Sequence, residues 1–154
     1  MRYPESYFIS SGKGCSEHQL VAFDKALCDA GIANYNLLKV SSILPAGAIK
    51  ADKIGLREGS PLLTAYARID SNSPGDRIAT AVGVAIPCDT NNVGVIMEYS
   101  GHCTSAEAET HIRAMCAKAM NNHGIEYNEI VVSSIEAIVS DDNYLSLISA
   151  IAFW

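Results

Sequence analysis

Apolar residues recur at the spacing of an α-helix in two parts of the chain. The first predicted helix covers residues 17–30. Ser16 and Gln19 have the spacing of a capping box, and Gly31 follows the last turn. Its apolar stripe consists of Leu20, Phe23, Leu27 and Cys28.

The second predicted helix covers residues 105–122. Thr104 and Glu107 form its capping box, and Gly124 is the expected stop. Its apolar stripe consists of Ala108, Ile112, Met115, Cys116 and Ala119.

Most of the remaining chain has the pattern of β-strands. The predicted strands cover residues 7–11, 36–43, 62–69, 77–86, 93–99, 130–139 and 147–154. Because 77–86 has no charge on either face inside the strand, we expect both faces to be covered. Several strands with two separated helices favour an α+β fold with helices packed on sheets. Residues 45–61 are predicted to form a long loop, of a length that is usually functional or mobile.

Composition narrows the class of protein. The chain has 154 residues, 49% of them hydrophobic and 18% charged, with a net charge of −6. This predicts one folded domain and disfavours binding of nucleic acid through clustered positive charge. Five cysteines without a C-x-x-C pair, and no apolar leader, lead us to expect a reduced, cytoplasmic protein without a membrane span. The apolar content with few aromatic residues indicates an oligomer.

Two carboxylates interrupt apolar patterns. Asp24 lies within the stripe of the first helix, and Glu98 is the only charge in strand 93–99. The structural interpretations are that Asp24 pairs with a cation or faces a subunit boundary, and that Glu98 is solvated at a strand end. The functional interpretations are a carboxylate kept for a cationic ligand, and a buried general acid with a raised pKa.

A third feature is a pair of serines, Ser41 and Ser42, at the end of a strand and just before a Pro/Gly loop. The tetrapeptide Val-Ser-Ser-Ile occurs again at 132–135, and Ser10-Ser11 is a further pair. The dipeptide alone is therefore not specific. Its surroundings distinguish the first copy, because only Ser41-Ser42 follows Asn34-x-Asn36 and precedes such a loop.

Other catalytic patterns are weaker. The four histidines have no metal-ligand spacing, and neither a G-x-S-x-G motif nor a phosphate-binding loop is present. Cys103 lies near a predicted helix N-terminus, which would lower the pKa of its thiol. A thiol- or metal-dependent protein that uses Cys103 and His102 is therefore one alternative, although no base for the thiol is identifiable.

Several blocks together resemble the pyruvoyl-dependent arginine decarboxylases. They occur in the family's order, and the likeness extends from about residue 7 to residue 154. The blocks are Ala22-Phe23-Asp24-x-Ala26-Leu27-x-x-Ala30-Gly31-Ile32, Asn34-x-Asn36-Leu37-x-x-Val40-Ser41-Ser42-Ile43-x-Pro45, Thr64-Ala65-Tyr66, Val84-Ala85-Ile86-Pro87 and Ile96-Met97-Glu98-Tyr99-x-Gly101.

The resemblance implies that a proenzyme cuts itself between Ser41 and Ser42, into chains 1–41 and 42–154. Ser42 would become a covalent pyruvoyl group, the cofactor, and Asn36 would assist the cleavage. The pyruvoyl carbonyl would form a Schiff base with L-arginine, which would lose CO2 to give agmatine for polyamine synthesis or acid resistance. Glu98 would be the proton donor, and Asp24 would bind the guanidinium group of the substrate.

The family fold is an αββα sandwich of a single domain, and its members form trimers or dimers of trimers with sites at subunit interfaces. The chain departs from the family at Ala33, Tyr35 and Ser100 and in the loop 50–59. These departures leave open another amino acid or S-adenosylmethionine as substrate. An alternative of another class is an unprocessed trimer that binds a small cationic amine through Asp24.

Overall fold

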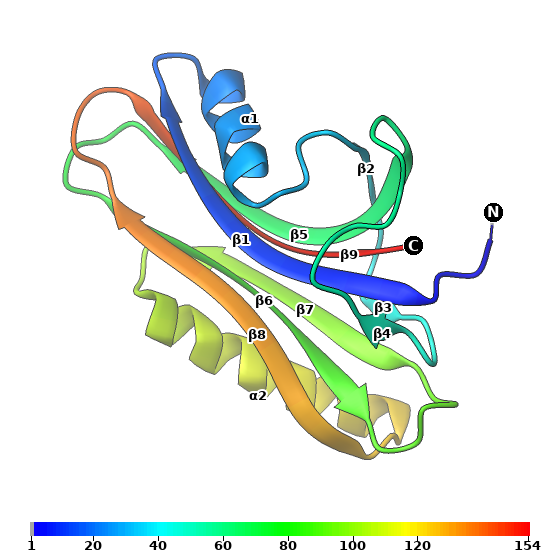
Figure 1. Cartoon of the computed structure of the whole chain (residues 1–154). Coiled ribbons are helices and arrows are strands. Elements are labelled where there is room, and N and C mark those ends of the chain that lie inside the picture. Colours follow the sequence, from blue (N-terminus) through cyan, green and yellow to red (C-terminus); the bar gives the residue numbers. More distant parts are fainter. Residues whose placement is uncertain (1) are drawn as a thin grey trace.

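Two β-sheets lie face to face between two helices in the computed structural model, which describes residues 2–154 (Figure 1). The layers are α1 (Gln19–Asp29), a five-stranded sheet, a four-stranded sheet and α2 (Ser105–His123). The strands are β1 (Ser6–Ser16), β2 (Asn36–Lys39), β3 (Ile43–Leu44), β4 (Ile49–Lys50), β5 (Pro61–Ser71), β6 (Arg77–Pro87), β7 (Gly94–Gly101), β8 (Tyr127–Ile138) and β9 (Tyr144–Phe153). The expected αββα order of an α+β fold is confirmed.

The two sheets differ in how their strands run. The five-stranded sheet has the order β2-β5-β9-β1-β4. Its three long strands are antiparallel, and the short strands β2 and β4 are added in parallel at its edges. The four-stranded sheet has the order β3-β7-β6-β8 and is antiparallel throughout. No helix among residues 2–154 is long and apolar enough to cross a membrane.

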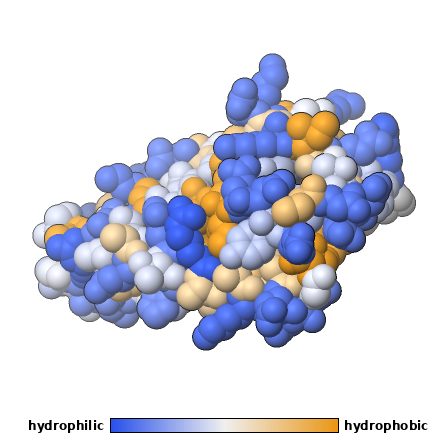
Figure 2. Space-filling view, turned by 90° about the horizontal axis from the view of Figure 1, so that it is seen from below, coloured by the Kyte–Doolittle hydropathy of each residue, from blue (hydrophilic) through white to orange (hydrophobic). Residues whose placement is uncertain are grey.

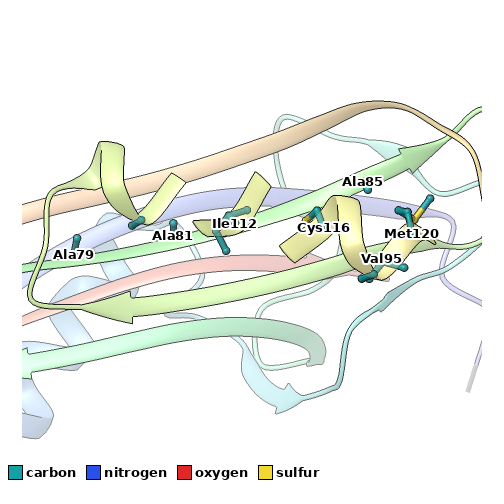
Figure 3. Packing of buried hydrophobic residues seen from close by; sticks show 9 residues of the cluster. Ala79, Ala81, Ala85, Val95, Ile112, Cys116 and Met120 are labelled. Atoms are coloured by element: carbon teal, nitrogen blue, oxygen red, sulfur yellow. The ribbon is translucent and has the colours of Figure 1, made fainter. Parts of the chain in front are cut away.

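Strand β6 is buried on both faces, as its sequence predicts. On one face, Ala79, Ala81 and Ala85 pack against Ile112 and Cys116 of α2 (Figure 3). The alternate residues of β6 belong to the core between the two sheets, where Val82 and Val84 meet Ile151 of β9. The small residues on the first face let α2 approach closely, and a Cβ at Gly83 would overlap Ile112.

Helix α2 begins and ends where the sequence predicts. Thr104 is its N-cap, and the capping box with Glu107 is formed. Gly124 adopts the left-handed conformation with φ 66°, which favours glycine at a helix end. The face of the molecule that α2 covers is largely hydrophilic, with apolar patches between the polar side chains (Figure 2).

Helix α1 differs from its prediction at its N-terminus. Its N-cap is His18, which makes no side-chain capping bond, and the predicted box of Ser16 and Gln19 is wrong. The reason is that β1 continues through Ser16, which pairs with Tyr144 of β9. Leu20, predicted in the buried stripe, is 73% exposed. The buried face of α1 consists instead of Ala22 and Ala26, followed by the C-cap residue Ala30.

The predicted single strand over 36–43 is wrong in a way that matters for function. Its first half, β2, pairs with β5, and the backbone N–H of Val40 donates to Thr64 at 3.1 Å. Its second half, β3, pairs with β7 of the other sheet, and Ile96 N–H donates to the Ser42 carbonyl at 2.7 Å. The chain therefore crosses from one sheet to the other at residues 40–42. The predicted loop 45–61 is irregular except for β4, which pairs with β1, and Pro61, which begins β5.

Candidate active site

The crossing at residues 40–42 separates Ser41-Ser42 from the other serine pairs. Ser41 is exposed and Ser42 is half-buried, and neither lies within a regular strand. In the second copy of the tetrapeptide, both serines lie inside β8, and each hydroxyl has a hydrogen-bond partner on another element. The Ser133 hydroxyl lies 2.8 Å from that of Ser11, and the Ser134 hydroxyl donates to Glu109 at 2.6 Å.

Glu98 lies beside this crossing. It is two residues beyond Ile96, which bonds the Ser42 carbonyl, and it lies within β7 rather than at the strand end that the sequence predicts. Glu98 is half-buried, and burial raises the pKa of its carboxyl group. The positive charge of Lys39 and backbone hydrogen bonding from Tyr66 oppose that rise. A carboxyl group with a raised pKa holds its proton closer to neutral pH.

The topology explains why the carboxyl group of Glu98 meets the backbone of β5. Strand β2 covers the edge of β5 only as far as the pair Lys39–Thr64. Beyond that point the chain leaves for the other sheet, so the edge of β5 is open at Tyr66. In the four-stranded sheet, β3 pairs with β7 only at Gly94 and Val95, and the Ser42 carbonyl adds one bond to Ile96. Two uncovered edges thus lie on the same side of the crossing.

A cavity of about 510 Å³ lies at these edges. Its lining consists of Lys39, Tyr66, Ala67, Arg68, Glu98, Tyr99 and Ser100. The Lys39 ammonium nitrogen lies 4.5 Å from the centre of the Tyr66 ring. The Arg68 guanidinium donates to Asp70 at 2.7 Å and lies 3.7 Å from the centre of the Phe23 ring. A larger hollow of about 790 Å³ around Trp154 does not have Glu98 in its lining, and Ser42 lines neither of these two cavities.

Asp24 is not in the lining of the Glu98 cavity. It is exposed on α1, and among residues 2–154 it has no ion pair or side-chain hydrogen bond. Asp24 therefore does not pair with a cation within the described chain, and it lies off the buried face of α1, which is its alanine face. Its neighbour Phe23 contacts Arg68, which does line the cavity.

Asn36 lies at the far end of β2 from the serine pair. Its amide group donates to the Gly59 carbonyl at 2.7 Å. An extended chain rises about 3.3 Å per residue, so Asn36 and Ser41 are at most about 16 Å apart. Tyr35 also faces away from the cavity, because its hydroxyl reaches Leu56 and its ring packs in the core below α1. The departure from the family at Tyr35 therefore lies outside the cavity lining.

The thiol alternative loses its physical basis. Burial and the negative charges of Glu107 and Glu136 raise the pKa of Cys103, whereas the sequence predicts that a helix N-terminus lowers it. His102, its neighbour, is not part of any cluster of three or more potential metal ligands in the part of the chain that the structure describes.

Three residues of the cavity were missed by reasoning from the sequence: Lys39, Tyr66 and Arg68. Tyr66 belongs to a block that carries the family resemblance, although no role followed from it. Lys39 is three residues before Ser42 and is the only charge in β2. That isolated charge in a short apolar strand is the signal that marks it.

Comparisons with known proteins show the family of the chain. Residues 6–154 match the family described as pyruvoyl-dependent arginine decarboxylase. A relative of that name from Thermococcus kodakarensis is 40% identical over 90% of this chain and 88% of its own length. One from Methanocaldococcus jannaschii is 38% identical over 90% and 84%. The chain belongs to the pyruvoyl-dependent arginine decarboxylase family.

A solved structure supports the fold. A pyruvoyl-dependent histidine decarboxylase matches 66% of this chain and 53% of its own chain, with a TM-score of 0.53 and 12% sequence identity. At this identity the likeness concerns the fold alone.

Family membership implies a covalent pyruvoyl group, and the residues of this chain fit it. A pyruvoyl group requires a residue with a β-hydroxyl or thiol at the cleavage point, and Ser42 supplies one at a position outside the regular ladder of either sheet. The partly buried carboxyl group of Glu98 lies two residues along β7 from the strand's bond to Ser42.

Proposed function

We propose that this member of the pyruvoyl-dependent arginine decarboxylase family processes itself and converts L-arginine to agmatine and CO2. The observation that carries the proposal is the chain crossing, where the Ser42 carbonyl accepts a hydrogen bond from Ile96 of β7, two residues before the partly buried Glu98. Membership of the family, with the match over residues 6–154, supports arginine as the substrate.

Self-cleavage uses the hydroxyl group of Ser42. Its oxygen attacks the Ser41 carbonyl carbon, the amide bond breaks, and an ester forms in its place. Loss of the ester by β-elimination releases a carboxylate at Ser41 and leaves dehydroalanine at position 42. Hydrolysis of that residue releases ammonia and gives the pyruvoyl group. The hydrogen bond from Ile96 to the Ser42 carbonyl fixes one side of the reacting segment.

Decarboxylation needs an electron sink and a proton. The pyruvoyl group supplies the sink for the electrons that CO2 leaves behind. Glu98 supplies the proton to the α-carbon, because burial raises the pKa of its carboxyl group. The uncovered edges of β5 and β7 give the cavity its opening to solvent.

We also propose that the working unit is a homotrimer, or a dimer of trimers, in which a neighbouring copy completes the site. Asp24 is exposed and outside the cavity of its own chain, so binding of the substrate guanidinium requires a copy placed against the opening. Asn36 lies at the end of β2 away from the serine pair and its amide group bonds Gly59, so a role in cleavage has the same requirement. The long edge strand β8, which pairs only with β6 among residues 2–154, is available for such contacts.

A cytoplasmic location is part of the proposal. All five cysteines are unpaired, and three of them, Cys15, Cys28 and Cys88, are exposed. Exposed thiols are kept reduced in the cytoplasm.

The test is a substrate panel on the purified, processed protein. L-Arginine, L-lysine, L-ornithine, L-histidine and S-adenosylmethionine are supplied with a labelled carboxyl group, and CO2 and amine product are measured. Arginine is expected to give agmatine, and Asp24→Asn to lower its kcat/KM about 10- to 100-fold through loss of a charge-assisted pair. The control Asp142→Asn removes an exposed carboxylate in the turn between β8 and β9. Release of CO2 from another substrate but not from arginine overturns the assignment.

A further inference from the structure

One cation in the Glu98 cavity has no anionic partner within hydrogen-bonding reach. Arg68 is held by two hydrogen bonds to Asp70, so its charge is already matched. Lys39 has no ion pair among residues 2–154. Its ammonium group is held instead over the Tyr66 ring, 4.5 Å from its centre.

This position links Lys39 both to the crossing at Ser42 and to the cavity that Glu98 lines. It is the last residue of β2 and lies three residues before Ser42, so its backbone leads directly into the crossing. Its side chain rests on Tyr66, whose backbone bonds the Glu98 carboxyl group. Lys39 and Glu98 line the same cavity, and the two groups attract each other across it.

We propose that Lys39 is a positioning residue for the decarboxylation, whose ammonium group, seated on the Tyr66 ring, stabilises the negative charge of the Glu98 carboxylate across the cavity that both residues line. The inference rests on the proposed function only for its effect on turnover. The electrostatic coupling of the two side chains is a property of the protein whether or not it acts on arginine.

The other groups around Glu98 leave Lys39 as the controlling charge. From β5, Arg68 is neutralised by Asp70, and from β7 the neighbours are Tyr99 and Ser100. On β6, Glu98 is paired with Val82, which is fully buried. From α2, His111 stacks on the Tyr99 ring with 4.5 Å between ring centres. Tyr99 therefore separates His111 from the cavity.

The experiment measures the Glu98 carboxyl group directly. Glutamate is labelled with ¹³C at the side-chain carboxyl carbon, and the Glu98 resonance is identified by its absence in Glu98→Gln. Its titration midpoint is compared in the wild type, Lys39→Met and Lys39→Arg. Removal of the positive charge is expected to move the midpoint to higher pH, and arginine is expected to restore it. Lys118→Met is the matched control, because Lys118 is exposed on α2 and lies outside the cavity lining.

Turnover gives a second, separate result. If the enzyme is active, the alkaline limb of its pH profile is expected to move to higher pH in Lys39→Met, together with the Glu98 midpoint. In Lys39→Arg it is expected to return to the wild-type position. An unchanged Glu98 midpoint in a folded Lys39→Met protein overturns the role of Lys39. If the Glu98 midpoint shifts in Lys39→Met but the processed wild-type protein releases no CO2 from arginine, the coupling is supported and the proposed function is overturned instead.

Discussion

At the scale of single residues, Glu98 shows what a sequence reveals about a site. A lone acid in an apolar strand is recognisable from the pattern of residues 93–99, and the resemblance gives it a role. Its partners are not recognisable, because Lys39 and Tyr66 come from two other strands that meet β7 only in the folded chain. Asp24 shows the reverse. It lies within the apolar stripe of the sequence but is exposed, since small alanines form the packing face of α1.

The pH dependence of turnover follows from Glu98. The proton donor must carry its proton, so activity is expected to fall as pH rises through the pKa of Glu98, which burial raises above the ordinary value of a glutamate. In Glu98→Gln, the glutamine side chain has a shape similar to that of glutamate but carries no acidic proton. It is expected to lower kcat about 10²- to 10⁴-fold and to abolish that limb of the pH profile. Steady-state CO2 release between pH 5 and pH 9 measures both, with Glu126→Gln, an exposed acid outside the cavity, as control. Full activity of Glu98→Gln would contradict the role of proton donor.

At the scale of elements, helix α1 is held by close contact rather than by capping. Gly12 and Gly14 of β1 leave room for the backbone of the helix, and a Cβ at Gly12 would overlap the carbonyl of Ala26. The sequence shows the helix but not its distance from the sheet, because that distance depends on a pairing of glycines with alanines from different elements. The end of α2 at Gly124 was predictable, since a left-handed cap is a local property.

Replacement of Gly12 by alanine tests this contact. The added methyl group meets backbone atoms of α1 that have no flexible side chain to move away. Overpacking of this kind is expected to lower the free energy of unfolding by about 1–3 kcal/mol. Gly101→Ala is the matched control, because a Cβ there lies at an ordinary 3.4 Å from Tyr99. Equal stability of the two variants in urea unfolding would show that α1 is not packed this closely.

At the scale of the whole molecule, the serine pair lies where the chain passes between the two sheets. The α+β class and the covered strand β6 were predictable from alternation along the chain. The crossing was not, because residues 36–43 read as one continuous strand and only pairing with β5 and β7 divides them. Cleavage at this point cuts a connection between sheets without cutting a strand.

The fragment 1–41 keeps most of its contacts after such a cut. It supplies β1 and β2 to the five-stranded sheet and α1 to the layer that covers it, and β1 pairs with β9 from Tyr7 to Ser16. Both fragments are therefore expected to stay together in the folded protein and to separate only when it is denatured.

The most direct measurement is the intact mass of the purified protein under denaturing conditions, with a native mass beside it. The account predicts fragments 1–41 and 42–154, with the larger one lighter by one ammonia than a chain that begins with free Ser42. It also predicts that native protein contains both, and that Ser42→Ala stays whole. A single uncut chain that remains unchanged on incubation and still decarboxylates arginine would contradict the account.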